Sequence, residues 1–235
     1  MALRTVAETD STNDDMAALA EAGAAEGLWL RAERQRAGRG RQGRSWISPP
    51  GNLYASTLVR LGAGDPPPAS LAFVTGVALH EALSAFAPGL ALKWPNDILG
   101  GAAKLAGILL ERRGAAVIIG CGANLAHHPD LPERPTTAIA ALAGHAPDPD
   151  AVLHALAESF ARWLGRWRGE GVAPVLARWQ ALAHAPGTAL AAHLPDGTRI
   201  AGLYEGLEPD GALRLRLADG TRHVIHAADI FLVQD

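Results

Sequence analysis

The chain changes character after residue 185, and this change constrains its fold more than any other feature. Four short segments rich in strand-forming residues follow, at 189–194, 199–205, 212–217 and 222–225. Each of the three connections between them contains Asp-Gly, a pair that tolerates the positive φ of tight turns. Short strands joined by such turns predict a small β-barrel. We therefore expect one unit at residues 1–184 and a second, the barrel, at residues 185–235.

The first 184 residues mix helical and strand patterns. Apolar residues recur at helical spacing in 70–86 and from 148 onwards, and a further helix is expected at 172–183. Residues 10–15 place Ser and Thr three positions before aspartates, which predicts the start of a helix. Strand character is found at 28–35, 53–60, 91–93, 106–111 and 115–120. The short connection between the last two strands favours an antiparallel pair.

Composition excludes several classes of protein. The chain has 235 residues, 49% of them hydrophobic and 19% charged, with a formal net charge of −3. Such values are typical of a soluble globular protein and give no general basic excess for binding polyanions. No run of about 18 apolar residues and no signal peptide is present, so we expect a cytoplasmic location. The single cysteine, Cys121, lies in an apolar run and is expected to be a buried, inert thiol.

Lysine is almost absent from this arginine-rich chain. Only Lys93 and Lys104 occur, against nineteen arginines, and they lie eleven residues apart. An ammonium group is compact and has movable donors, whereas guanidinium is a planar fork. The two lysines therefore either mark positions where arginine fails or fall together by chance. Lys93 opens the polar cluster Lys-Trp-Pro-Asn-Asp at the end of a predicted strand, where binding sites are often built, although the cluster alone could be a turn.

Residues 38–44 combine three glycines and three arginines and cannot pack as a regular element. Glycine lets backbone amides approach an anion closely, and guanidinium groups can clamp a phosphate or a carboxylate. A solvated basic turn or an RNA contact remains the alternative. Trp46 follows closely and offers an aromatic surface that could cover a base. Residues 120–125 carry two glycines after an apolar strand, which suits either close approach to a ligand or a plain turn.

Taken together, these motifs resemble those of biotin protein ligases. The resemblance rests on Ser-Thr-Asn at 11–13, Gln35, the Gly-Arg loop with Trp46, the lysine-bearing runs at 93–97 and 104–109, and Gly-x-Asn at 122–124, in this order. It implies an α+β fold, with a class II synthetase-like catalytic domain whose mixed sheet is flanked by helices, and a C-terminal SH3-like barrel. Because the chain begins just before its Ser-Thr-Asn motif, it resembles the ligase-only type that lacks an N-terminal DNA-binding domain.

The resemblance implies a two-step reaction and a set of site residues. Biotin and Mg-ATP would give biotinyl-5′-AMP, whose biotin passes to a lysine of a biotin carboxyl carrier domain. Residues implied in binding biotin are Ser11, Thr12, Asn13, Gln35, Arg39, Gly40, Arg41, Lys104 and Gly107. Residues implied in binding ATP and the adenylate are Arg41, Trp46, Asn96, Lys104 and Asn124. The loop at 38–46 would order over both ligands as a lid that excludes water.

Catalysis is assigned to Lys104, Arg41 and Asp97. A carboxylate attacking an anionic α-phosphate needs a well-placed cation, for which Lys104 is the candidate. Asp97 could take a proton from the acceptor amine or simply orient that amine. No metal site is expected beyond the Mg²⁺ carried by the nucleotide, no DNA partner is expected, and a homodimer is left open. A lipoate ligase is the alternative enzyme, and a nucleic-acid-binding module using the Arg-Gly loop is the alternative outside enzymes.

Overall fold

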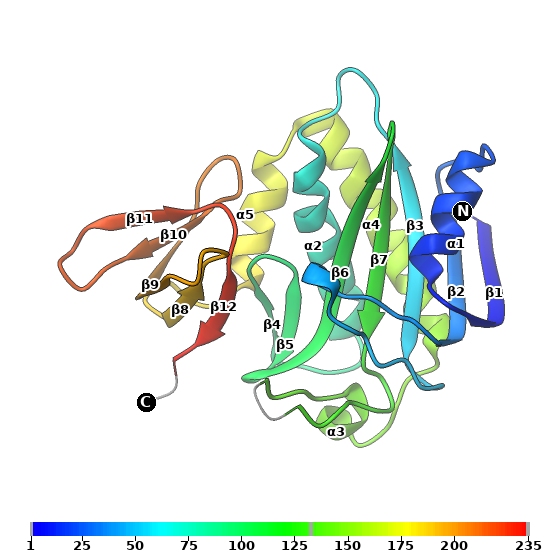
Figure 1. Cartoon of the computed structure of the whole chain (residues 1–235), viewed down its shortest axis with the longest axis horizontal. Coiled ribbons are helices and arrows are strands. Elements are labelled where there is room, and N and C mark those ends of the chain that lie inside the picture. Colours follow the sequence, from blue (N-terminus) through cyan, green and yellow to red (C-terminus); the bar gives the residue numbers. More distant parts are fainter. Residues whose placement is uncertain (1, 132–133, 234–235) are drawn as a thin grey trace.

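Two β-sheets organise the computed structural model, which describes residues 2–131 and 134–233 (Figure 1). The larger sheet has seven strands in the order β1-β2-β3-β7-β6-β5-β4. Its strands are β1 (Ala2–Thr9), β2 (Leu28–Gln35), β3 (Leu53–Arg60), β4 (Leu90–Lys93), β5 (Asp97–Gly100), β6 (Ala103–Arg113) and β7 (Ala116–Ala123). β1 and β2 run parallel and the other neighbours are antiparallel, so the sheet is mixed, as expected.

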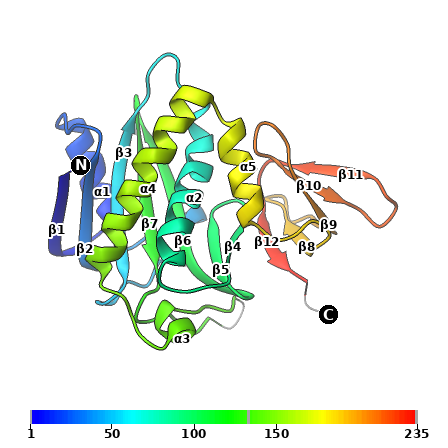
Figure 2. The same cartoon turned by 180° about the vertical axis from the view of Figure 1, so that it is seen from behind.

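Helices cover both faces of this sheet. α2 (Leu71–Ser84), α4 (Pro149–Glu170) and α5 (Ala173–Leu182) lie together on one face, as the reverse view shows (Figure 2). α1 (Thr12–Glu21) packs against the opposite face, where Met16 meets Leu30, Leu58 and Ile118. A short helix, α3 (Ile139–Ala143), follows the sheet. None of the helices in the described part of the chain is long and apolar enough to cross a membrane.

Sequence rules explain the longest helix, α4. Its N-cap, Asp148, accepts a hydrogen bond from the Asp150 amide at 3.0 Å, and Pro149 occupies the first helical position, where no amide donor is needed. Its apolar stripe, which includes Leu156, Phe160 and Trp167, is buried against α2 and the sheet. The helix stops at Gly171, whose φ of 81° few other residues adopt.

The C-terminal residues form an antiparallel sheet of five strands in the order β11-β10-β9-β8-β12. The strands are β8 (Ala189–His193), β9 (Arg199–Leu207), β10 (Leu213–Arg216), β11 (Arg222–Ile225) and β12 (Asp229–Leu232). The first four match the expected segments, whereas β12 was not expected. The structure shows this sheet and no closure of β11 onto β12 among the described residues, so it does not confirm a barrel.

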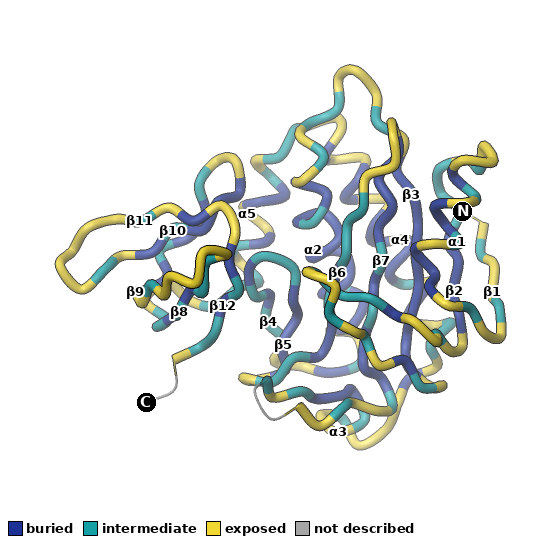
Figure 3. Tube along the Cα trace, in the orientation of Figure 1, coloured by how far each residue is buried: buried dark blue, intermediate teal, exposed yellow. Residues whose placement is uncertain are grey.

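Alternate residues of β7 face opposite sides of the large sheet, and they determine which side is packed with side chains and which side leaves space for a pocket. Ile119 and Cys121 face the core under α2, and Cys121 is buried with its thiol pKa raised to about 12 by burial. Ile118 faces the other way, under α1. Two residues with the same orientation, Gly120 and Gly122, carry no side chain and leave room beside α1. Figure 3 shows that the central strands of this sheet, β3 and β7, are mostly buried, whereas the edge strand β1 is mostly exposed.

Candidate functional site

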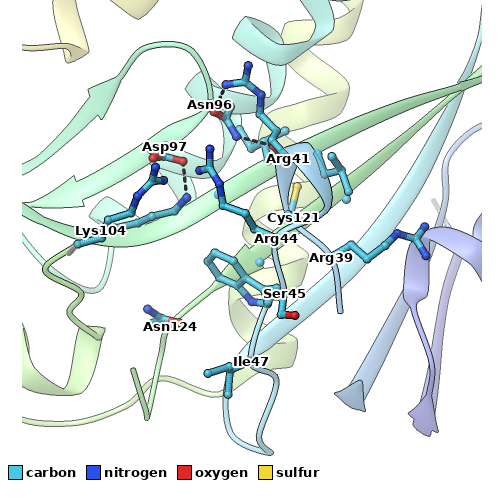
Figure 4. A pocket seen from close by; sticks show the side chains of 18 of the residues that line it. Arg39, Arg41, Arg44, Ser45, Ile47, Asn96, Asp97, Lys104, Cys121 and Asn124 are labelled. Atoms are coloured by element: carbon cyan, nitrogen blue, oxygen red, sulfur yellow. Dashed lines mark hydrogen bonds and ion pairs between the residues drawn. The ribbon is translucent and has the colours of Figure 1, made fainter. Parts of the chain in front are cut away.

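One pocket lies on the α1 side of the sheet, between the C-terminal end of β2, the strands β5 to β7 and the C-terminal sheet (Figure 4). Every site residue implied by the resemblance lines it: Ser11, Thr12, Asn13, Gln35, Arg39, Gly40, Arg41, Trp46, Asn96, Asp97, Lys104, Gly107 and Asn124. These residues come from segments up to about 110 positions apart, and the fold alone brings them together.

Both lysines of the chain converge on one buried carboxylate. Lys104 Nζ lies 2.6 Å from Asp97 Oδ1, and Lys93 Nζ lies 3.3 Å from Asp97 Oδ2. Burial alone would raise the pKa of the Asp97 carboxyl, but the charges and hydrogen bonds of the two ammonium groups outweigh it, so the pKa lies below its ordinary value. Asp97 is therefore an anion at neutral pH, which makes it a poor proton acceptor and a good holder of cations.

The two lysines have different surroundings. Lys93 is the more enclosed, with burial lowering its pKa, and it donates to the Ile230 carbonyl at 2.8 Å. Lys104 instead lies with its Nζ 5.5 Å from the centre of the Trp46 ring, inside the pocket. Both lysines line the pocket, but Lys104 is the more exposed of the two, and Lys93 also ties the site to the C-terminal sheet.

At one end of the pocket, uncharged side chains form a hydrogen-bond network that is tied to the carboxylate of Glu111. Gln35 Oε1 accepts from the amide and the hydroxyl of Thr12, at 2.9 and 3.1 Å, and Gln35 Nε2 donates to Ser48 Oγ at 3.1 Å. Asn13 Oδ1 accepts from Ser56 Oγ at 2.7 Å, while its Nδ2 donates to Glu111 at 2.7 Å. The orientation of both amides is set before a ligand enters, which favours recognition of a small polar group.

Ser11 completes this end of the pocket. It is the N-cap of α1, as the helix-start signature predicted, yet its side chain makes no capping hydrogen bond. Ser11 is only 3% exposed, and it lines the pocket. The pattern therefore identified the helix boundary correctly but not the hydrogen bond, and the cap hydroxyl is left for a ligand.

The Gly-Arg loop at 38–46 is folded back on itself and anchored. The Trp46 amide donates to the Gly38 carbonyl at 2.8 Å, and a Cβ on Gly38 would come within 2.6 Å of Trp46 O, so only glycine fits there. Arg41 Nη1 donates to Asn96 Oδ1 at 3.1 Å, and Arg44 pairs with Asp229. Sequence periodicity does not reveal these partners, because they are polar side chains far from the loop in sequence.

The Arg39 side chain points away from the rest of the loop, towards α1. It forms a two-pronged ion pair with Asp14 on α1, at 2.5 and 2.6 Å, and approaches Glu111 at 3.4 Å. Its guanidinium therefore points away from Arg41 and Arg44, towards α1 and β2 (Figure 4). Arg39 lines the pocket, and its ion pairs with Asp14 and Glu111 hold the start of the loop in place.

Trp46 lies on a floor made of glycines. Gly107 on β6 and Gly122 on β7 are paired across the sheet, and a Cβ on Gly122 would reach within 2.7 Å of Trp46 Cε2. The indole Nε1 of Trp46 is buried and has no hydrogen-bond partner among the described residues. A flat aromatic ring, a flat floor and a nearby ammonium together suit a planar ligand.

The two asparagines of the motifs support backbone. Asn96 Nδ2 donates to the Ile108 carbonyl at 2.8 Å, and Asn124 Nδ2 donates to the Thr137 carbonyl at 3.0 Å. Asn96 also accepts from Arg41, so it links the loop to the strand that carries Lys104. In the structure both asparagines hold backbone carbonyls, and their expected role towards the nucleotide stays a prediction.

Several other residues that line the pocket were not predicted as site residues, among them Arg44, Arg134, Asp229 and Ile230. Arg44 belonged to the recognised loop, so its position was a usable signal. Asp229 and Ile230 begin β12, a strand too short and too weakly patterned to predict, and Arg134 lies in a proline-rich connection. Only the docking of the C-terminal sheet reveals Asp229 and Ile230 as pocket residues.

Comparison with known proteins agrees with this geometry. Residues 6–124 match the Biotin/lipoate A/B protein ligase family, and residues 193–233 match the Biotin protein ligase C terminal domain. The chain is similar to a biotin--[acetyl-CoA-carboxylase] ligase of Paracoccus denitrificans, with 41% identity over 96% of this chain and 98% of that protein. The corresponding ligase of Mycobacterium tuberculosis is 32% identical over 97% of this chain and 88% of that protein.

A solved structure gives the same result. The biotin protein ligase from Aquifex aeolicus in complex with biotin and ATP superposes with a TM-score of 0.87 at 25% identity, covering 99% of both chains. The match therefore extends through the large sheet and the C-terminal sheet. With its site motifs, its two matching family domains and these relatives, the chain belongs to the biotin/lipoate protein ligase family, as a biotin protein ligase.

Proposed function

We propose that this protein activates biotin with ATP to biotinyl-5′-AMP and transfers the biotin to a lysine of a biotin carboxyl carrier domain. It is an enzyme of the biotin--[acetyl-CoA-carboxylase] ligase class. The residue roles rest on one observation, the Asp97 cluster. In it a buried carboxylate holds the Lys104 ammonium in the pocket, next to uncharged donors and acceptors that are already hydrogen-bonded to one another.

In the first step the biotin carboxylate attacks the α-phosphate and pyrophosphate leaves. Both reactants are anions, so bringing them together is the main electrostatic cost. Asp97 holds the Lys104 ammonium at 2.6 Å, and that ammonium projects over Trp46, where it can contact both reactants. We assign Lys104 this charge-stabilising role. No general base is needed, because a carboxylate is ionised at neutral pH.

In the second step the acceptor amine attacks the carbonyl of the mixed anhydride, AMP leaves, and the amine loses a proton. Asp97 is surrounded by two ammonium groups and its pKa is lowered, which argues against its taking that proton. We propose that Asp97 orients the lysines instead. Arg41, on the loop, would meet the phosphate of the adenylate and thereby slow its release.

The uncharged end of the pocket suits the ureido ring of biotin, which has one carbonyl acceptor and two N–H donors. We assign Ser11, Thr12, Asn13 and Gln35 to it, with Gly40 and the backbone of Arg39 closing over it and Gly107 beneath. Trp46 would cover the adenylate, with Asn96 and Asn124 holding the surrounding strands. Mg²⁺ would arrive with the nucleotide, because the two carboxylates that line the pocket, Asp97 and Asp229, already pair with cations.

The second unit is also part of the proposal. We propose that residues 185–235 are a separate domain of the SH3-like class, following a catalytic domain at 1–184. The turn-linked antiparallel strands and the family match over residues 193–233 support this division. A cytoplasmic location, the homodimer and the lack of a DNA-binding domain stay predictions.

ATP–pyrophosphate exchange tests the activity. Radiolabelled pyrophosphate should enter ATP only when biotin is present, and lipoate should not replace biotin. Adding a carrier domain should then give a mass increase equal to one biotin on one lysine. Exchange with lipoate but not biotin would make the chain a lipoate ligase. Binding of oligonucleotide with a steep salt dependence, without exchange, would favour the nucleic-acid alternative.

A further inference from the structure

The C-terminal sheet contributes a charged residue to the catalytic pocket. Asp229, the first residue of β12, lines the pocket and pairs through Oδ2 with two arginines. One is Arg44 of the Gly-Arg loop, and the other is Arg134, at 3.2 Å, in the connection after β7. Arg44 extends towards Asp97 and Lys104, on the reacting side of the pocket (Figure 4). One carboxylate thus joins three segments that are far apart in sequence.

The position of Asp229 is set by how the two sheets dock. Next to it, the Ile230 carbonyl accepts from Lys93 Nζ at 2.8 Å, and the Gly211 carbonyl accepts from Trp94 Nε1 at 3.0 Å. The guanidinium of Arg134 also lies 5.2 Å from the centre of the Phe231 ring, on the same strand. These contacts fasten β12 beside the pocket, so Asp229 cannot follow the loop if the loop moves.

Electrostatics gives this carboxylate a role. Without it, two guanidinium groups would face one another across the pocket mouth and repel. Asp229 offsets that repulsion yet leaves a surplus positive charge, which can still attract a phosphate. Burial alone would raise the pKa of the Asp229 carboxyl, but Arg44 and Arg134 outweigh it and keep it ionised.

We propose that Asp229 is a positioning residue that holds Arg44, and with it the outer end of the loop at 38–46, together with Arg134 at the pocket mouth. Order in the loop then depends on docking of the C-terminal sheet. Asp229 acts through these arginines and not on the reacting atoms. The part of the proposal that concerns ATP rests on the proposed function, whereas the part that concerns the loop does not.

The first test is limited proteolysis of the ligand-free protein. Asp229→Asn keeps the size of the side chain but removes its charge. Asp219→Asn is the matched control, because Asp219 lies in the turn between β10 and β11, where, within the described part of the chain, its side chain accepts hydrogen bonds from Thr221 alone. We expect subtilisin to cut within residues 38–46 about three to ten times faster in Asp229→Asn, since cleavage follows the open population and the ion pairs are partly exposed. The control should match the wild type.

The second test separates positioning from mere stability. In ATP–pyrophosphate exchange, Asp229→Asn should raise KM for ATP by about three- to tenfold with a smaller change in kcat, because the arginines are displaced but Lys104 is not. Asp229→Glu should recover most of the loss by restoring the charge. If the wild-type protein shows no biotin-dependent exchange, the proposed function fails, but the proteolysis comparison still decides the role of Asp229.

Two results would overturn the inference. One is equal cutting of the loop in Asp229→Asn, Asp219→Asn and the wild type, with an unchanged KM for ATP. The other is a lowered melting temperature with cuts spread over the whole chain, which would make Asp229 a residue of general stability. Melting curves of all variants are therefore recorded beside the proteolysis.

Discussion

At the scale of single residues, the chemistry depends on one ammonium group held by one carboxylate. Replacing Lys104 by arginine keeps the charge but exchanges a compact ammonium group for a planar guanidinium group. The ammonium lies 2.6 Å from Asp97 and close to the Gly107 backbone, so a larger group has little space there. We expect Lys104→Arg to fold normally and to lower biotin-dependent ATP–pyrophosphate exchange by about a hundredfold, corresponding to about 2.7 kcal/mol of lost transition-state stabilisation.

Lys93→Arg is the natural comparison, because Lys93 contacts the same carboxylate but donates its other hydrogen bond to the Ile230 carbonyl. It should affect exchange less than Lys104→Arg and melting temperature more. Near-normal exchange in Lys104→Arg would remove Lys104 from the mechanism. Equal losses in both variants would show that the cluster acts as a unit.

At the scale of elements, a buried histidine fastens α2 to β4. His80 Nε2 lies 3.0 Å from the Leu90 carbonyl, and its Nδ1 lies 3.3 Å from Ser84 Oγ, an arrangement that suits the neutral imidazole. Burial lowers the pKa of His80 below its ordinary value of 6.5. The unfolded chain then binds more protons just below pH 6.5, so the free energy of unfolding should fall as the pH decreases through this range.

Chemical denaturation between pH 5 and 7.5 measures this effect. His80→Gln keeps a donor for the Leu90 carbonyl but does not titrate, so its stability should change less with pH than that of the wild type. The slope attributable to one group cannot exceed about 1.4 kcal/mol per pH unit. Identical pH slopes for the two proteins would show that His80 titrates alike in the folded and unfolded states.

At the scale of the whole molecule, the Lys-Trp-Pro-Asn-Asp motif serves two purposes. Asp97 belongs to the pocket, whereas Trp94 donates its indole hydrogen to Gly211 in the C-terminal sheet and is itself buried. Trp94→Phe removes that bond and leaves a buried carbonyl without its donor, so we expect a loss of about 1–3 kcal/mol of stability. Amide hydrogen exchange should accelerate throughout β8 to β12.

Trp163→Phe provides the matched control, since Trp163 Nε1 bonds to Glu81 at 3.1 Å within the helical layer. That variant should lose stability without faster exchange in the C-terminal sheet. Similar exchange in both variants would mean that the Trp94 bond does not secure the docking of the two sheets.

The sequence by itself determined the elements with strong local patterns. β2 and β3 begin and end where their apolar runs predict, and α4 follows its capped, periodic stripe. β1, β5 and β12 were missed: β1 is an exposed edge strand, β5 begins inside the polar Lys-Trp-Pro-Asn-Asp run, and β12 is a short strand near the end of the sequence. Local pattern reports burial of one face, whereas β1 and β12 pair with β2 and β8, which are not adjacent to them in sequence.

The candidate site, too, could be predicted from the sequence only in part. The motifs, through the family that they resemble, pointed to residues that the fold brings into one pocket, although other residues that line it were not predicted. Only the tertiary structure decided that Lys93 and Lys104 share Asp97, that Arg39 turns to Asp14, and that Asp229 reaches Arg44. The physical reason is that an ion pair depends on distance in space, and strand pairing and docking of the two sheets set those distances, on which sequence spacing carries no information.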